Sequence, residues 1–116
     1  MTLLIATLAG AAGAVLRYVV SGVVQHRTRS GFPLGTLTVN LSGALLLGLV
    51  AGVDNLESST TLAAAAFLAG FTTFSTWMIE TLRLGPSPFR LRPIANLSIT
   101  LLLGVVLCAV GYSLTN

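Results

Sequence analysis

The stretch LAGFTTFSTW, residues 68–77, decides how the third long apolar segment of this chain folds. It brings uncharged hydroxyl side chains and aromatic rings together; the hydroxyls belong to Thr72, Thr73, Ser75 and Thr76. Counted from Thr60, residues 70–73 lie roughly 15–20 Å along a helix, close to the centre of a ~30 Å hydrocarbon core. A helix break at that depth is tolerated only where the backbone is buried in protein or lines a cavity. The stretch therefore predicts a broken third helix with a site at the break.

The composition predicts a membrane protein. The chain has 116 residues, of which 54% are hydrophobic and 8% charged, whereas soluble domains carry about 25% charged residues. Four apolar segments, at about 3–24, 34–53, 60–82 and 94–114, are each long enough to cross a bilayer. We expect one all-α, four-helix membrane domain over residues 1–116. The net charge of +3 is too small and scattered for a nucleic-acid surface.

Charges between the segments predict an orientation. The stretches QHRTRSGFP, from Gln25, and RLGPSPFRLRP, from Arg83, are expected to be loops on one side of the membrane. Their basic residues are His26, Arg27, Arg29, Arg83, Arg90 and Arg92. The other side holds Asp54, Glu57 and no Arg. The positive-inside rule then places both termini outside the cytoplasm.

Polar residues at membrane depth are costly and are therefore candidates for function. Arg17 is either a topology anchor that reaches the interface or a charge that attracts anions to a vestibule. Asn40 either hydrogen-bonds between helices or lines a pore. Glu80 lies at a depth where it can pair with Arg17. Asn96 and Thr100 share one face of the fourth segment, as a polar track or as groups bonded within their own helix.

The aromatic residues of the opening stretch have two interpretations. Phe74 and Trp77 lie on one helical face, with Ser75 and Thr76 beside them. They are either packing residues or ring edges that meet an anion, since those edges carry partial positive charge. With hydroxyl and amide donors, such edges replace the water shell of a small anion without a fixed cation that would trap it.

These stretches together resemble the Fluc/CrcB fluoride channels. The matching segments are GAAGAVLRY (10–18), GTLTVNLSGALLLG (35–48) and AGFTTFSTWMIE (69–80), with the row Thr100, Gly104 and Gly111 in the fourth segment. The resemblance implies passive, selective fluoride efflux through an antiparallel dimer with two pores. It also implies a bacterial or archaeal plasma membrane and a structural sodium ion at the dimer centre.

The resemblance also implies roles for individual residues. The pore and anion-binding positions would be Asn40, Phe74, Ser75, Thr76, Trp77 and Thr100, with Arg17 matching the arginine of the first span and Glu80 a polar position of the third. The backbone carbonyls of Ala69 and Thr72 would bind sodium.

The chain also departs from the family pattern. It has Trp77 where Phe is usual, Ala69 where Gly is usual, Thr100 where Ser is usual and Asn96 where an aromatic is common. The one-sided charge and these departures suggest one half of a two-gene pair, with a paralogous partner of opposite orientation; a homodimer is the alternative.

Two other functions remain open at this stage. A small multidrug-type transporter has a similar length, but cation export of that kind needs an acidic residue in the first span, and this span contains Arg17 and no acid. A structural subunit that conducts nothing would explain Trp77 and Asn96 as losses from a channel face. An enzyme is not expected, because the sequence offers no nucleophile–base pair, metal cluster or phosphate loop.

Overall fold

The structure, a computed structural model, describes residues 1–53, 57–84 and 91–116. Those residues form helices and short turns and contain no strand. The helices are α1 (Thr2–Thr28), α2 (Leu34–Ala51), α3 (Ser59–Phe71), α4 (Ser75–Arg83) and α5 (Leu91–Thr115). α3 and α4 form one interrupted span, so the described residues hold 4 segments long and apolar enough to cross a membrane. The predicted all-α fold with a broken third helix is confirmed.

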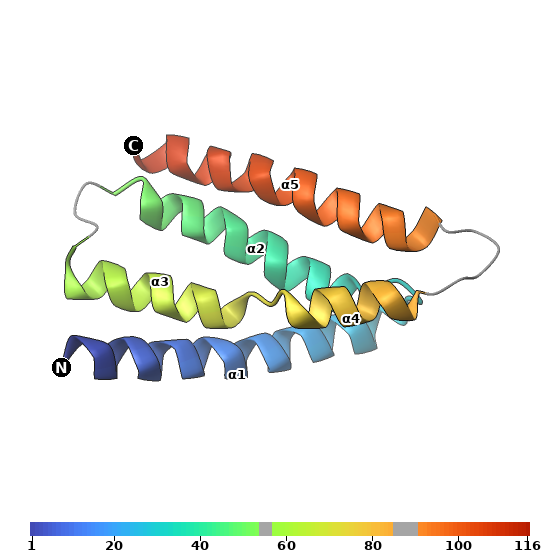
Figure 1. Cartoon of the computed structure of the whole chain (residues 1–116), viewed down its shortest axis with the longest axis horizontal. Helices are drawn as coiled ribbons and strands as arrows, with labels where there is room; N and C mark the ends of the chain where they lie inside the picture. Colours follow the sequence, from blue (N-terminus) through green and yellow to red (C-terminus); the bar gives the residue numbers. More distant parts are fainter. Residues whose placement is uncertain (54–56, 85–90) are drawn as a thin grey trace.

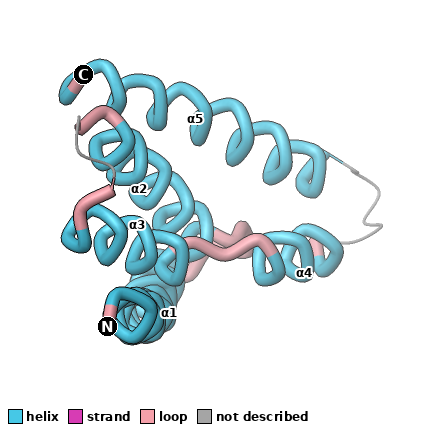
Figure 2. Tube along the Cα trace, turned by 60° about the vertical axis from the view of Figure 1, so that its left-hand side comes forward, coloured by secondary structure: helices cyan, strands magenta, loops and turns pink. Residues whose placement is uncertain are grey.

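The helices pack in two pairs. α1 lies along α3, and α2 lies along α5, while both termini sit at one end of the bundle (Figure 1). After the break the chain changes neighbours: α4 packs against α5 and α2 instead of continuing along α1. Figure 2 shows the short loop that separates α3 from α4. The break therefore moves the second half of this span from one helix pair to the other.

Glycines allow both pairs to pack closely. A Cβ atom on Gly13 of α1 would overlap the carbonyl oxygen of Phe67 in α3. A Cβ atom on Gly48 of α2 would overlap the carbonyl of Cys108 in α5. Such close backbone approach drives helix association in lipid, where burial of apolar surface supplies no net force between helices.

The first helix is longer than the sequence indicates. The loop expected from Gln25 is wrong, because α1 continues to Thr28 and ends at Arg29, whose φ of 49° is left-handed. The Gln25 side chain stabilises the turn that follows. Its Nε2 donates to the Ser30 carbonyl at 2.8 Å and the Phe32 carbonyl at 3.1 Å, and its Oε1 accepts from the Gly35 amide at 3.0 Å. Gln25 thereby ties the end of α1 to the start of α2.

Other boundaries shift by a few residues. α2 ends at Ala51 instead of residue 53. α5 begins at Leu91 instead of residue 94, because Pro93 falls in the first helical turn, where a missing amide hydrogen costs nothing. Asp54 and Arg90, which the charge argument includes, lie outside the described residues. The basic residues at the ends of α1 and α4 and at the start of α5 lie at the end of the bundle opposite the termini, as expected.

The outer surface is apolar. Leu3, Val15 and Leu102 are 83%, 65% and 65% exposed, respectively, whereas Val39, Leu68 and Phe71 form the buried apolar core of the described residues. A surface of this kind is stable only in contact with lipid or another apolar surface. The chain is therefore a multi-pass membrane protein.

Candidate functional site

The break between α3 and α4 exposes backbone groups that a continuous helix would satisfy. α3 ends at Phe71, Thr72 is extended with φ −87° and ψ 162°, and α4 begins at Ser75. The Thr72 hydroxyl donates to the carbonyls of Leu68 at 3.2 Å and Ala69 at 3.3 Å. Among the described residues, nothing donates to the Thr72 carbonyl. Two backbone oxygens of the predicted sodium site, those of Ala69 and Thr72, thus lie within one turn of the break.

Asn40 of α2 holds the break in place. Its Nδ2 donates to the Thr73 carbonyl at 2.9 Å, and its Oδ1 accepts from the Thr73 amide at 2.8 Å. One side-chain amide therefore satisfies both backbone polar groups of Thr73. The assignment of its oxygen and nitrogen follows from the pairing, because a backbone N–H can only donate. Asn40 was expected either to hydrogen-bond between helices or to line a pore, and the structure shows a hydrogen-bonded contact from α2 to the break. One Nδ2 hydrogen remains for a further acceptor.

A groove of about 370 Å³ begins at the break and runs between α2, α4 and α5. Its polar end is lined by Asn40, Thr72, Thr73 and Thr100, and the rings of Phe74 and Trp77 form a wall. The remainder of its lining is apolar and includes Leu101 and Gly104. None of the described residues that line it is charged. The groove therefore offers amide and hydroxyl groups without a fixed cation.

The two rings meet edge to face. The centroids of Phe74 and Trp77 are 5.7 Å apart, and the ring planes are inclined at 77°. Phe74 is 71% exposed, so its ring is free to meet lipid or another subunit. Trp77 is more enclosed, and its Nε1–H donates to the backbone carbonyl of Asn96 in α5 at 3.4 Å.

A small polar network joins α4 to α5 beside that ring. Asn96 is 1% exposed and Thr81 is 5% exposed. Asn96 Nδ2 donates to Thr81 Oγ1 at 2.7 Å, and Thr81 Oγ1 donates to the Trp77 carbonyl at 2.7 Å. Buried polar groups are stable when they are paired in this way. Thr100, one turn beyond Asn96, is 8% exposed, but its hydroxyl has no partner.

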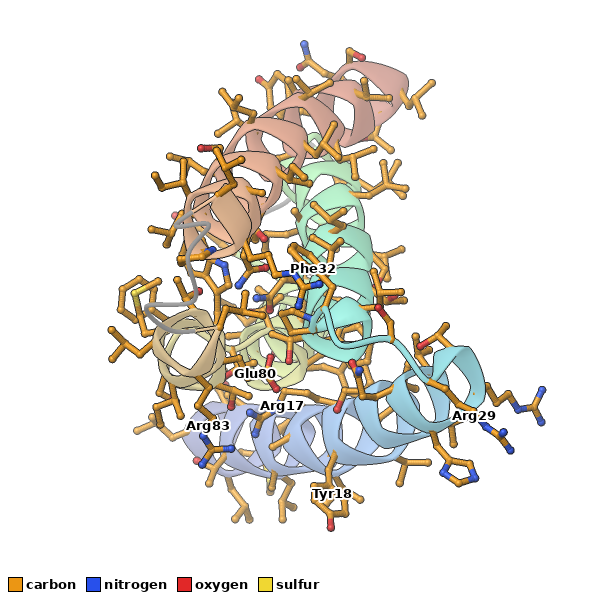
Figure 3. The ribbon with its side chains drawn as sticks, turned by 90° about the vertical axis from the view of Figure 1, so that its right-hand side faces the viewer. Arg17, Tyr18, Arg29, Phe32, Glu80 and Arg83 are labelled. Atoms are coloured by element: carbon orange, nitrogen blue, oxygen red, sulfur yellow. The ribbon has the colours of Figure 1, made fainter. Side chains whose placement is uncertain are left out.

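A second and larger cavity, about 680 Å³, opens toward the Arg-rich end of the bundle. Tyr18, Gln25 and Thr36 line it, together with Thr76 and Glu80 of α4. The side chains of Arg17 and Glu80 approach each other from α1 and α4 (Figure 3). Among the described residues, Arg17 Nε and Glu80 Oε2 are buried without hydrogen-bond partners, and the pairing of these two side chains stays a prediction.

Comparison with known proteins agrees with this arrangement. Residues 4–112 match the family described as CrcB-like protein, Camphor Resistance (CrcB). The chain belongs to the CrcB family. A relative named fluoride-specific ion channel FluC 2, from Mycolicibacterium paratuberculosis, is 46% identical over 109 residues, which cover 94% of this chain and 89% of the relative. FluC 2 of Mycobacterium tuberculosis is 42% identical over 104 residues, covering 90% and 82% of the two chains.

A third relative is named FluC 1 instead of FluC 2. Fluoride-specific ion channel FluC 1 of Rubrobacter xylanophilus is 46% identical over 107 residues, covering 90% of this chain and 86% of the relative. The similarity therefore extends over nearly the whole of this CrcB chain and includes the break and both helix pairs.

The site residues predicted for this CrcB chain fall into three places. Asn40, Phe74, Trp77 and Thr100 line the groove, with Thr72 at its polar end. Thr76 lines the 680 Å³ cavity with Glu80 instead. Ser75 is exposed and lines neither cavity, and Arg17 is half-buried and lines neither cavity. The structure thus gathers the central residues into one groove and leaves the others around it.

Some residues of the site were not foreseen from the sequence. Thr73 was known only as one hydroxyl of the opening stretch, whereas its backbone is the partner of Asn40. Thr81 joins Asn96 to α4. Thr81 lies one helical turn after Trp77, and this spacing could have indicated that the two residues share a face of the helix. No spacing in the sequence indicates which helix Asn40 contacts.

Proposed function

We propose that this chain is a subunit of a fluoride-selective channel that lets fluoride leave the cytoplasm passively. The observation that carries the proposal is the uncharged groove at the helix break, lined by Asn40, Thr100 and the rings of Phe74 and Trp77. Fluoride is small and strongly hydrated, so its passage needs donors that replace water and no cation that retains it. The relatives named fluoride-specific ion channels support the same ion.

We propose that the channel is an antiparallel dimer. Phe74, at 71% exposed, and the open side of the groove would then meet a second subunit. The basic residues at the end opposite the termini favour one insertion direction, with the termini outside the cytoplasm. A chain fixed in this orientation needs a paralogous partner inserted the other way; the numbers 1 and 2 in the relatives' names support the existence of such paralogues.

The backbone at the break would hold a structural sodium ion between the subunits. Carbonyl oxygens are suitable ligands for a hard cation, and the Thr72 carbonyl lacks a donor among the described residues. The Ala69 carbonyl accepts only a long bond of 3.3 Å from a side chain close to it. Two carbonyls from each subunit would face the ion at the dimer centre. The bound ion would neutralise the partial negative charges of these carbonyl oxygens at the interface.

The test is fluoride efflux from proteoliposomes, measured with a fluoride electrode after valinomycin is added. The chain is reconstituted alone and together with a paralogue encoded beside it. We expect rapid fluoride release from the paired sample and no chloride release. A proton-coupled multidrug transporter would instead move an organic cation against a pH gradient, and a structural subunit would leave the fluoride flux of its partner unchanged.

A further inference from the structure

The hydroxyl of Thr100 differs from those of three other helical threonines in its hydrogen bonding. Those of Thr7, Thr38 and Thr81 each donate to the carbonyl four residues earlier, at 2.7–2.8 Å. This is the usual way for a threonine in a membrane helix to satisfy its hydroxyl. Thr100 is 8% exposed, and its Oγ1 is buried without a partner among the described residues. The acceptor that lies four residues earlier is the Asn96 carbonyl.

That acceptor is occupied by Trp77. The Asn96 carbonyl has two lone pairs. The backbone N–H of Thr100 takes one in the regular pattern of α5, and Trp77 Nε1–H donates to the same oxygen at 3.4 Å from the other helix. The Thr100 hydroxyl is left without its local acceptor. Thr100 lines the groove together with Asn40 and Phe74. Its Oγ1 is buried in that wall without a partner among the described residues, so its hydrogen is not committed to another acceptor there.

The position of the Trp77 ring is fixed from two sides. Thr81 joins the Trp77 carbonyl to the Asn96 amide through bonds of 2.7 Å. The Phe74 ring packs against the indole edge to face. The indole N–H is directed at the Asn96 carbonyl.

We propose that Trp77 is a positioning residue: by donating to the Asn96 carbonyl, it keeps the Thr100 hydroxyl available as a hydrogen-bond donor to an anion in the groove. This inference rests on the proposed fluoride conduction and assigns Trp77 a part in it. Since no charged residue lines the described part of the groove, each neutral donor contributes a large share of the attraction for the ion. The indole N–H then acts on the anion through Thr100.

A double-mutant cycle on fluoride efflux tests the coupling. Thr100→Val removes the donor, and replacing Trp77 by 3-benzothienylalanine, which has the same shape without the N–H, lets the Thr100 hydroxyl bond back to Asn96. Each change should slow efflux by about 10-fold, as expected for one hydrogen bond to a charged group. The double variant should be no slower than either single one. Thr7→Val, whose hydroxyl is bonded within α1, should retain wild-type efflux.

The alternative outcomes contradict the proposal. If the double variant slows efflux by about 100-fold, the product of the two single effects, Trp77 and Thr100 act independently, and the indole contacts the ion itself. If the benzothienyl variant conducts like the wild type, the indole hydrogen has no part in conduction. Gel filtration of each variant in detergent shows whether it assembles, and Trp77→Phe gives a second removal of the N–H.

A second readout does not depend on transport. The chain has one Trp, so its single indole N–H resonance is assigned without ambiguity in detergent-solubilised protein. We expect a resonance that exchanges slowly with deuterium and does not move during a fluoride titration or in Thr100→Val. A fluoride-dependent shift of that resonance would overturn the proposal. If the wild type carries no fluoride but the indole hydrogen is protected, the proposed function fails and the Trp77–Asn96 contact stands.

Discussion

Replacing Asn40 by Ala should destabilise the helix break, because one side chain satisfies both backbone polar groups of Thr73. The two bonds measure 2.9 Å and 2.8 Å. An unsatisfied buried donor or acceptor costs about 1–3 kcal/mol. Both bonds are only part-buried, and hydrogen bonds between membrane helices contribute about 0.6 kcal/mol on average. We therefore expect Asn40→Ala to lower the free energy of unfolding by about 2–3 kcal/mol. This is near the lower end of the cost of leaving two such groups unsatisfied.

The assay is unfolding in mixed micelles of increasing SDS content, followed by the fluorescence of Trp77, the one Trp of the chain. Ser42→Ala is the matched control on the same helix, because the Ser42 hydroxyl bonds within α2, to the Thr38 carbonyl at 2.7 Å. Asn40→Asp keeps an acceptor for the Thr73 amide and loses the donor, so it should fall between Asn40→Ala and the wild type in stability. If Asn40→Ala costs no more than Ser42→Ala, Asn40 does not hold the break.

Three further predictions concern packing, orientation and the cation. Gly13→Ala should weaken assembly by about 1–3 kcal/mol, because its Cβ would meet the Phe67 carbonyl, whereas Gly22→Ala, with nothing within 4 Å, should be neutral or slightly stabilising in thermal unfolding; equal effects would argue against close α1–α3 contact. Replacing Arg27 and Arg29 by Glu should move the termini of a substantial share of molecules to the cytoplasm, as read by phosphatase fusions; an unchanged orientation would contradict the charge argument. Exchanging sodium for N-methyl-D-glucamine throughout purification should slow fluoride efflux, and an unaffected fluoride flux would contradict the proposed sodium site.

The spans and the break were predictable because membrane helices follow simple rules. Length and apolarity located four spans to within a few residues, and the hydroxyls and rings of residues 68–77 marked the interruption. The end of α1 was missed because Gln25 looks like a loop residue in a polar stretch, although its side chain bonds across the turn to Ser30, Phe32 and Gly35. Side-chain bonds of that kind depend on the tertiary path of the chain.

Four of the seven predicted pore residues, Asn40, Phe74, Trp77 and Thr100, line one groove. That they bind an anion stays a prediction, and their hydrogen-bond partners were harder to predict. The partners of these residues come from helices far apart in sequence: Asn40 bonds to Thr73, 33 positions away, and Trp77 to Asn96, 19 positions away. The acceptor of the indole N–H depends on the direction that α4 takes after the break, where it turns away from α1. No local sequence pattern specifies that direction.

The fluoride efflux measurement tests the central claim most directly. Proteoliposomes containing this chain and its paralogue should release fluoride within seconds to minutes of valinomycin addition and should retain chloride, and Asn40→Ala should abolish the release. Equal release of fluoride and chloride, or a fluoride flux that survives Asn40→Ala unchanged, would contradict a selective pathway built on the groove at the helix break.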